Sequence, residues 1–254
     1  MHSIFLTSTV LAATALVAAC GGGGGDAPTA TPIASFDGYY QGTASTGKQF
    51  QLLALENGQF YSLVGTTDAQ GVFQVTSLVE GRGTSTNSTF VTSSVKEFTS
   101  TGQVLSESLS ATYVPKTSVA GTLTYSNSSV TFNGTAPASN NYNYDTAATL
   151  SAVSGNWSGS SLYGEGQAFS ISTTGTINGT SAQGCKYTGT ASPRASGKNV
   201  LDVTVLFGPS PCALPGQTGS GGGVATVLAN GRQQLLIAIT NTDRSAGMVV
   251  FAQR

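Results

Sequence analysis

The chain has 254 residues and a formal net charge of −1 at pH 7, and only 8% of its residues are charged. Nucleic-acid binding requires a concentrated basic surface, which ten scattered Lys and Arg residues do not provide, so we expect no nucleic-acid partner. The single histidine is His2, which an export signal would remove. The mature protein would then lack histidine-dependent catalytic and zinc sites, and we expect a non-enzymatic protein without cofactors or metals.

The N-terminus has the pattern of an export signal. An uncharged stretch of 16 residues runs from Ile4 to Ala19, shorter than the roughly 18 residues of a membrane-spanning helix. It leads into Leu16-Val17-Ala18-Ala19-Cys20, which resembles the lipobox of bacterial lipoproteins. The resemblance implies a signal peptide over residues 1–19 and acylation of Cys20, as with palmitate. Met1-His2-Ser3 lacks the basic residues of such signals, and an ordinary signal peptide with a chance cysteine is the alternative.

A tether follows the cysteine. Five glycines, Gly21–Gly25, precede a segment without apolar periodicity, so residues 20–34 are predicted to be flexible. The run of Cys20 and glycines resembles the start of Gram-negative outer-membrane lipoproteins, some of which hold a β-barrel at the cell surface. In that family a residue other than Asp after the cysteine, here Gly21, implies sorting to the outer membrane. We therefore expect a lipid-anchored outer-membrane protein, either periplasmic or surface-exposed.

The rest of the chain is predicted to be all β. No segment after residue 34 carries a sustained helical pattern, whereas alternating and β-branched runs recur between turn signals such as Glu56-Asn57-Gly58. The predicted strands are Gln49–Leu55, Gln59–Val64, Phe73–Leu78, Thr89–Phe98, Val104–Val114, Val119–Tyr125, Ser129–Asn133, Gly166–Ser172, Thr176–Thr180, Cys185–Ala191, Asn199–Phe207, Gly223–Leu228, Gln234–Thr240 and Gly247–Ala252.

The body of the chain contains an internal repeat. Asp37–Gly42 matches Ser154–Gly159 at an offset of 117 positions. The two halves also close alike, with Ser129–Phe132 set against Met248–Phe251 at an offset of 119. Self-similarity of this kind indicates a tandem duplication.

The repeat predicts two β units, residues 35–137 and 150–254, joined by a linker over 138–149. Exported strands must hide their edges, so each unit is predicted to be an antiparallel β-barrel, with a sandwich as the alternative. Gly155-Asn156-Trp157 resembles the first strand of lipocalin and avidin barrels, which implies a barrel that can hold a ligand.

The two cysteines of the mature body form an even pair. Cys185 and Cys212 are 27 positions apart, and an exported protein folds where disulfides persist. A bridge between them would close a loop in the unfolded chain and so stabilise the folded state by roughly 3 to 4 kcal/mol. We expect this disulfide, with two buried thiols as the alternative.

Two catalytic patterns fail on inspection. Gly42–Lys48 fits the first seven positions of a nucleotide-binding P-loop, but Gln49 stands where Ser or Thr is required and no helix follows. Ser93–Lys96 has the Ser-x-x-Lys spacing of some acyl-enzymes but falls in a predicted strand. Neither pattern indicates an enzyme.

Three residues are candidates for ligand binding. Strand alternation places Glu107 in the middle of the apolar face of Val104–Val114, where it could bind a ligand in a barrel; the alternative is a residue at the mouth or one paired with Lys96. Trp157 and Tyr40 occupy matching repeat positions. The other aromatic side chains could form a sugar- or protein-binding surface or fill the core: Tyr39, Tyr61, Tyr142, Tyr144 and Tyr163.

These features predict a lipoprotein with a non-catalytic binding or structural role at the cell envelope, with a protein, a glycan or a small apolar molecule as its partner. A lipocalin-like carrier of a small apolar ligand is one alternative, and it requires a hollow unit lined by Glu107. The other alternative is an inhibitor of an external protease or lysozyme, for which the Pro-rich loop over 208–216 is the candidate.

Overall fold

The computed structural model describes residues 35–69, 72–137, 142–228 and 230–254. Residues 33–254 make up one compact unit. The signal peptide, Cys20 and the tether lie outside the described residues. Within the described ranges, no helix has the length and apolar character needed to cross a bilayer.

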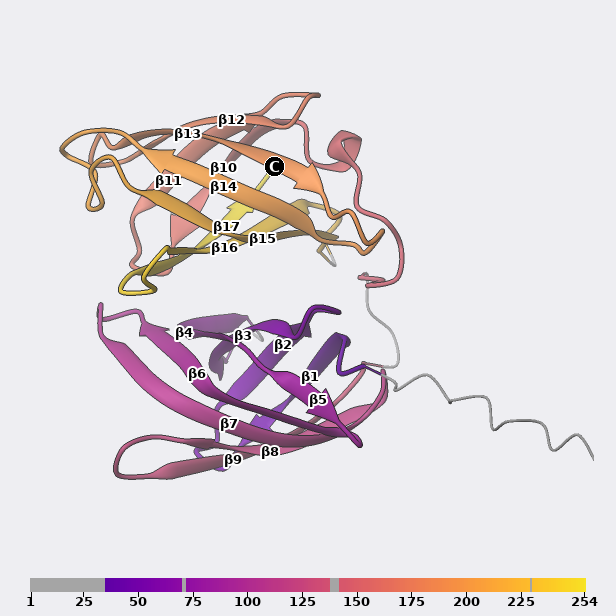
Figure 1. The fold of residues 1–254 in the computed structure, drawn as a ribbon. Coiled ribbons are helices and arrows are strands. Elements are labelled where there is room, and N and C mark those ends of the chain that lie inside the picture. The colour runs from indigo at the N-terminus through magenta and orange to yellow at the C-terminus, as the bar shows by residue number, and fades with distance from the viewer. Residues whose placement is uncertain (1–34, 70–71, 138–141, 229) are drawn as a thin grey trace, which may run out of the picture. The chain divides into compact units, whose positions relative to one another are not determined.

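The first barrel is built from eight antiparallel strands (Figure 1). Sequential hairpins join its strands, and the pairs β1–β9 and β4–β6 close it, while the short β5 pairs with β6 alone. The bounds are β1 (Gly38–Ala44), β2 (Gln49–Ala54), β3 (Gln59–Thr67), β4 (Phe73–Arg82), β5 (Thr84–Thr86), β6 (Thr89–Thr99), β7 (Val104–Val114), β8 (Ser118–Thr124) and β9 (Ser129–Thr135).

The second barrel is also closed and has eight strands. A short 3-10 helix, η1 (Leu150–Ala152), precedes it, and the pair β10–β17 closes the ring. The bounds are β10 (Gly155–Ser161), β11 (Gly166–Ile171), β12 (Thr176–Ser181), β13 (Lys186–Pro193), β14 (Leu201–Phe207), β15 (Thr218–Val227), β16 (Gln233–Asn241) and β17 (Gly247–Gln253). The prediction of an all-β chain with two tandem barrels is confirmed, and the sandwich alternative is excluded.

Each of the fourteen predicted strands coincides with an observed strand, with ends that differ by a few residues. The prediction missed β1, β5 and β10. The strand β10 is rich in glycine and small polar residues, which have low strand propensity, whereas β1 combines two glycines with two tyrosines. Gly42 in β1 and Gly159 in β10 are required by close backbone approach, so packing overrides propensity at these two positions.

Corresponding glycines show how closely the two barrels repeat. A Cβ on Gly42 would lie 1.9 Å from the carbonyl oxygen of Asn133, and one on Gly159 would lie 1.9 Å from that of Phe251. These glycines are 117 positions apart, and each lets the first strand of its barrel approach the last.

The closing strands correct the predicted repeat. Gln41 pairs with Thr135 in the first barrel, and Ser158 pairs with Gln253 in the second. The last strands are therefore offset by 118 positions, not by the predicted 119. An error of one residue in the offset matches side chains that point to opposite faces of the strand. Backbone pairing therefore gives the correct offset, which sequence similarity alone missed.

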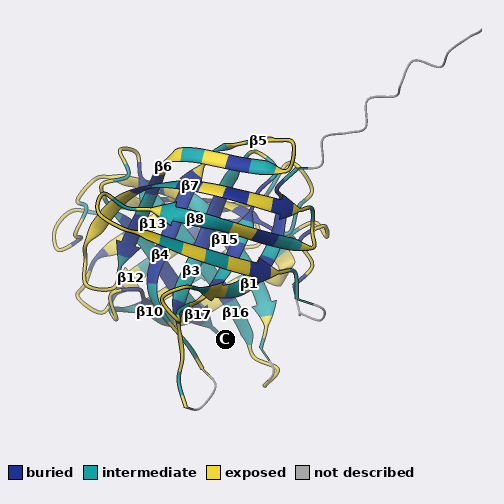
Figure 2. Ribbon diagram, turned by 90° about the horizontal axis from the view of Figure 1, so that it is seen from below, coloured by how far each residue is buried: buried dark blue, intermediate teal, exposed yellow. Residues whose placement is uncertain are grey.

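Burial alternates most clearly along β7, as Figure 2 shows. On β7, Glu107, Leu109, Ala111 and Tyr113 are buried, as alternation predicted, while Leu105, predicted on the same face, is 37% exposed near the hairpin. The predicted disulfide between Cys185 and Cys212 is present in the second barrel.

A third apolar cluster joins the outer faces of the two barrels. It contains Leu55, Tyr61, Leu78 and Phe98 from the first half and Leu162, Val200 and Val249 from the second. Tyr142 and Tyr144, in the connection between the barrels, belong to the same cluster and are 7% and 5% exposed. The connection therefore contributes to the packing.

Candidate functional site

The first barrel contains a cavity of about 140 Å³. Its walls combine apolar side chains from most of the barrel with a few polar groups near the β1–β2 hairpin, including Lys48, Glu97 and Tyr125. The apolar lining includes Phe50, Leu52, Phe60, Val64, Leu109, Leu123, Val130 and Phe132. An apolar interior with a few polar groups at one end is the usual composition of a small-molecule site.

The polar end of the cavity follows from the strand directions. In this up-and-down barrel, the β1–β2, β6–β7 and β8–β9 hairpins lie at the same end. Glu97 is close to the end of β6, Glu107 is close to the start of β7, and Tyr125 directly follows β8. The three polar side chains therefore meet at this end of the barrel.

A bulge in β6 decides which charged side chain enters the barrel. The pairing of β6 with β7 shifts between Thr92 and Val95. Strict alternation from the buried Phe90 would turn Lys96 inward and Glu97 outward, whereas the bulge turns Val95 and Glu97 inward. Glu97 is accordingly 8% exposed.

The alternative in which Glu107 pairs with Lys96 is therefore wrong. The Lys96 ammonium lies on the outer side and donates a hydrogen bond of 2.7 Å to the hydroxyl of Ser106. The neighbour of Glu107 is instead the carboxylate of Glu97, whose Oε2 accepts a hydrogen bond of 2.9 Å from the Tyr125 hydroxyl. Two acidic side chains thus lie together at the polar end of the cavity.

Glu107 is the less satisfied member of this pair. It is 5% exposed, and neither of its carboxylate oxygens has a hydrogen-bond partner of acceptable geometry within the described residues. Burial, followed by the proximity of Glu97, raises the pKa of Glu107 from 4.5 to about 8. At neutral pH Glu107 therefore favours its protonated form.

Glu107 does not itself line the cavity, although Leu109, two residues along the same face of β7, does. Glu97 and Tyr125 form the acidic part of the wall. Sequence reasoning missed both residues. Alternation from Val95 would have placed Glu97 inside the barrel only if the bulge had been recognised. Tyr125 lies in the turn after β8, where strand alternation makes no prediction.

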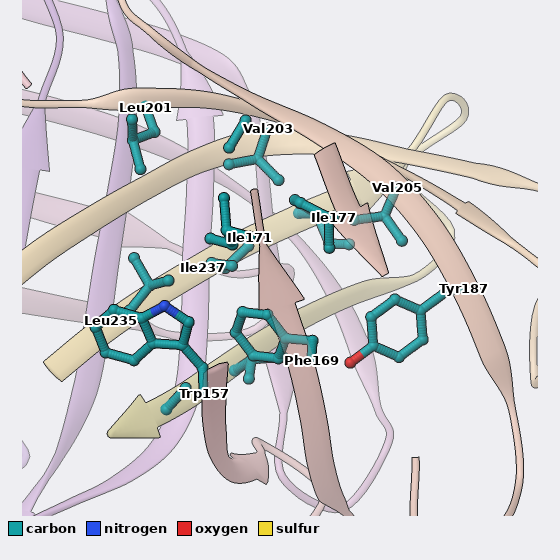
Figure 3. Packing of buried hydrophobic residues seen from close by; sticks show 14 of the residues in the cluster. Trp157, Phe169, Ile171, Ile177, Tyr187, Leu201, Val203, Val205, Leu235 and Ile237 are labelled. Atoms are coloured by element: carbon teal, nitrogen blue, oxygen red, sulfur yellow. The ribbon is translucent and has the colours of Figure 1, made fainter. Parts of the chain in front are cut away.

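The second barrel differs because large side chains fill the middle of its interior, while a pocket of about 370 Å³ lies at the end beside the loop over 208–216. Trp157, Phe169 and Tyr187 pack there with Ile171, Ile177 and Ile237, as Figure 3 shows. The Trp157 ring is 2% exposed, its Nε1 donates to the carbonyl of Val153 at 2.7 Å, and the Arg254 guanidinium lies 4.4 Å from its centroid. The structure thus places Trp157 in a core, and a ligand role for it stays a prediction.

Tyr40 has the corresponding place in the first barrel. It is fully buried, its hydroxyl donates to the carbonyl of Phe36 at 3.3 Å, and the same oxygen accepts from the backbone N–H of Lys116 at 3.1 Å. Like Trp157, it bonds to the carbonyl four residues before it, and Phe36 and Val153 are also 117 positions apart. These contacts indicate that Tyr40 seals the end of its barrel.

The remaining predicted features lie outside this cavity. Tyr61, Tyr142 and Tyr144 are buried, which excludes them from an exposed aromatic surface, while Tyr163 is 45% exposed. The loop over 208–216 is held by Cys212 and is largely exposed.

A larger polar groove of about 970 Å³ contains charges that already have partners. The Arg194 Nε lies 2.7 Å from Glu56, and its Nη1 lies 2.6 Å from Asp202. Arg244 pairs with Glu80 and donates at 2.7 Å to the hydroxyl of Ser94. The pairs Arg194–Glu56 and Arg244–Glu80 link the two barrels, and the cavity of the first barrel remains the stronger candidate site.

The sequence matches no protein-family model and no curated protein. Among solved structures, the crystal structure of isotype 1 transferrin binding protein B from serogroup B Neisseria meningitidis is similar, with 12% sequence identity and a TM-score of 0.26. The match covers 82% of this chain and 58% of that chain, so this chain spans little more than half of its length. Similarity at this level assigns no ligand, and a function must be argued from the residues themselves.

Proposed function

We propose that this protein is a lipid-anchored component of the outer membrane with a non-catalytic binding role, and that its first barrel carries a small, mainly apolar ligand. The observation that carries the proposal is the cavity of about 140 Å³ in the first barrel. A cavity of about 150 Å³ lined by apolar side chains holds a molecule the size of benzene. The second barrel, with large side chains across the middle of its interior, serves as a structural companion.

The binding role is proposed as non-catalytic because of the space available. A cavity of about 140 Å³ accommodates one small ring. Hydrolysis would need additional room for a leaving group and an attacking water between two carboxyl groups. The paired acidic side chains of Glu97 and Glu107 thus suit recognition better than turnover.

The anchor is proposed from the lipobox pattern and the glycine tether. Cells that produce the full chain are expected to incorporate labelled palmitate into it, and Cys20→Ala is expected to abolish the label. Label that survives the substitution would disprove the anchor. Protease accessibility on intact cells then distinguishes a surface-exposed protein from a periplasmic one.

The ligand site is tested with toluene, an uncharged probe of suitable size. The full chain is used with Cys20→Ala, so that it carries no acyl group and can be studied without detergent. It is expected to bind toluene in calorimetry. Leu109→Phe fills part of the cavity and is expected to weaken binding at least tenfold. Leu206→Phe, at a residue 49% exposed on the second barrel, is the matched control and should leave binding unchanged. Absence of binding by toluene and by singly charged analogues of it would contradict the carrier role.

The inhibitor hypothesis stays a prediction. The loop over 208–216 is exposed and cross-linked through Cys212, which is compatible with a rigid projecting segment. Inhibition of a protease or lysozyme by the purified chain, lost on replacement of this loop, would favour that role over the carrier role.

A further inference from the structure

The polar end of the first-barrel cavity holds more acidic groups than the protein itself neutralises. Glu97 and Glu107 are both buried, and no ion pair within the described ranges includes either of them. Buried carboxylates are normally paired with a cation or fully hydrogen-bonded. Here Glu97 has one hydrogen bond, from Tyr125, and Glu107 has none of acceptable geometry.

The nearby cations do not fill this role. Lys96 extends from the outer side of β6 toward Ser106. Lys48, on the β1–β2 hairpin, lines the same cavity, but its ammonium donates to the hydroxyl of Thr76 at 3.5 Å. The charged and titratable groups that face Glu107 are therefore Glu97 from β6, Tyr125 after β8 and, farther along the lining, Lys48.

The rest of the cavity wall is apolar. The rings of Phe50 and Phe132 meet edge to face with centroids 5.5 Å apart, and Leu52, Leu109 and Leu123 also belong to this part of the wall. A ligand that satisfies both the polar and the apolar parts of the wall must combine a compact apolar body with a cationic hydrogen-bond donor. An anion would be repelled by the acidic pair.

Resting on the proposed carrier role, we infer that the first barrel binds a small organic amine, with its ammonium group held by Glu97 at the cavity wall, next to the buried Glu107, and its apolar body in the cavity. The ammonium supplies the donors and the positive charge that the two carboxylates lack. Because Glu107 is protonated at neutral pH in the free protein, binding of an ammonium group favours its ionised form and releases a proton.

The inference is tested with benzylamine, toluene and benzoate, which share a ring and differ in charge. Calorimetry on the full chain with Cys20→Ala is expected to show that benzylamine binds at least about tenfold more tightly than toluene and that benzoate does not bind. At pH 7 the heat of benzylamine binding should vary with the ionisation enthalpy of the buffer, which reports proton release, whereas that of toluene should not.

The double variant Glu97→Gln/Glu107→Gln keeps the shape of both side chains and removes their charge. It is expected to bring benzylamine affinity close to that of toluene and to leave toluene affinity unchanged, while Glu165→Gln in the second barrel is the control that changes neither. Equal affinities of the native sequence for benzylamine and toluene would overturn the amine inference and leave the carrier role intact. Absence of binding by all three probes would overturn both.

Discussion

At the scale of single residues, the burial of Glu107 makes the stability of the folded protein depend on pH. The Glu107 carboxyl group lies inside the first barrel next to Glu97, so the folded protein favours the protonated form. In the unfolded chain the same group has its ordinary pKa near 4.5. Between these two pKa values the folded state binds one proton more than the unfolded state, and stability must fall as the pH rises.

We expect the free energy of unfolding to decrease between about pH 4.5 and about pH 8 through this group. Glu107→Gln should remove that component, so the variant should match the native sequence near pH 4 and exceed it by a few kcal/mol above pH 8. Urea unfolding across this pH range measures the difference. An identical pH dependence of both proteins would contradict the buried, protonated state of Glu107.

At the scale of strands, glycines determine how tightly each barrel closes. Gly42 and Gly159 sit where the first strand meets the last, and a side chain at either position would collide with a backbone carbonyl. The sequence similarity between the halves was carried partly by these glycines. The two halves therefore share the glycine that barrel closure requires, and their similarity does not rest on composition alone.

Gly159→Ala is expected to destabilise the second barrel by about 1–3 kcal/mol, because neighbouring backbone must move to admit the methyl group. Gly166→Ala is the matched control, since its Cβ would approach nothing closer than 3.5 Å. Trp157 is the single tryptophan of the chain and reports unfolding of this barrel by fluorescence. Equal stability of the two variants would contradict the proposed closure.

The disulfide stabilises the same barrel by a separate mechanism. It links residues 27 positions apart, and replacing both cysteines by serine should lower the free energy of unfolding by about 3 kcal/mol. Denaturant unfolding followed by Trp157 fluorescence provides the measurement. A change well under 1 kcal/mol would indicate that local packing alone fixes the loop over 208–216.

The sequence predicted the strands well because alternation is a local property, and it placed Glu107 on the correct face for that reason. It failed where local pattern and pairing disagree. The bulge before Val95 turns Glu97 into the barrel and Lys96 out of it. The residues at the bulge give no signal in the sequence from which it could have been predicted. The burial of Tyr142 and Tyr144 was missed because it depends on residues from both barrels, which a linker-like composition does not reveal.

At the scale of the whole molecule, the contacts between the barrels combine an apolar cluster with ion pairs. Glu56 of the first half accepts hydrogen bonds of 2.7 Å from both Arg194 and the Tyr144 hydroxyl. Partial burial by itself would raise the pKa of Glu56, but hydrogen bonds from Arg194 and Tyr144 outweigh it and lower the pKa from 4.5 to about 2. Glu56 therefore fastens the connection and the second barrel to the first.

The depressed pKa of Glu56 predicts a loss of stability in acid. Its contribution is present above about pH 4.5 and disappears as the pH falls toward 2, because the unfolded chain takes up the proton first. Glu56→Gln is expected to cost about 1–2 kcal/mol at pH 7 and nothing near pH 2. A pH-independent difference between the two proteins in urea unfolding would show that the ion pair is not the cause.

The central claim is that the first barrel is the binding part of the molecule and that the second, with large side chains across its middle, is a structural companion. The most direct test is a titration of the isotope-labelled full chain carrying Cys20→Ala with benzylamine, followed residue by residue by NMR. We predict that the amide shifts concentrate on residues around the first cavity, such as Leu109, Leu123 and Phe132, while Ile177 and Ile237 stay unchanged. Shifts that concentrate in the second barrel or in the groove near Arg194 and Arg244 would contradict it.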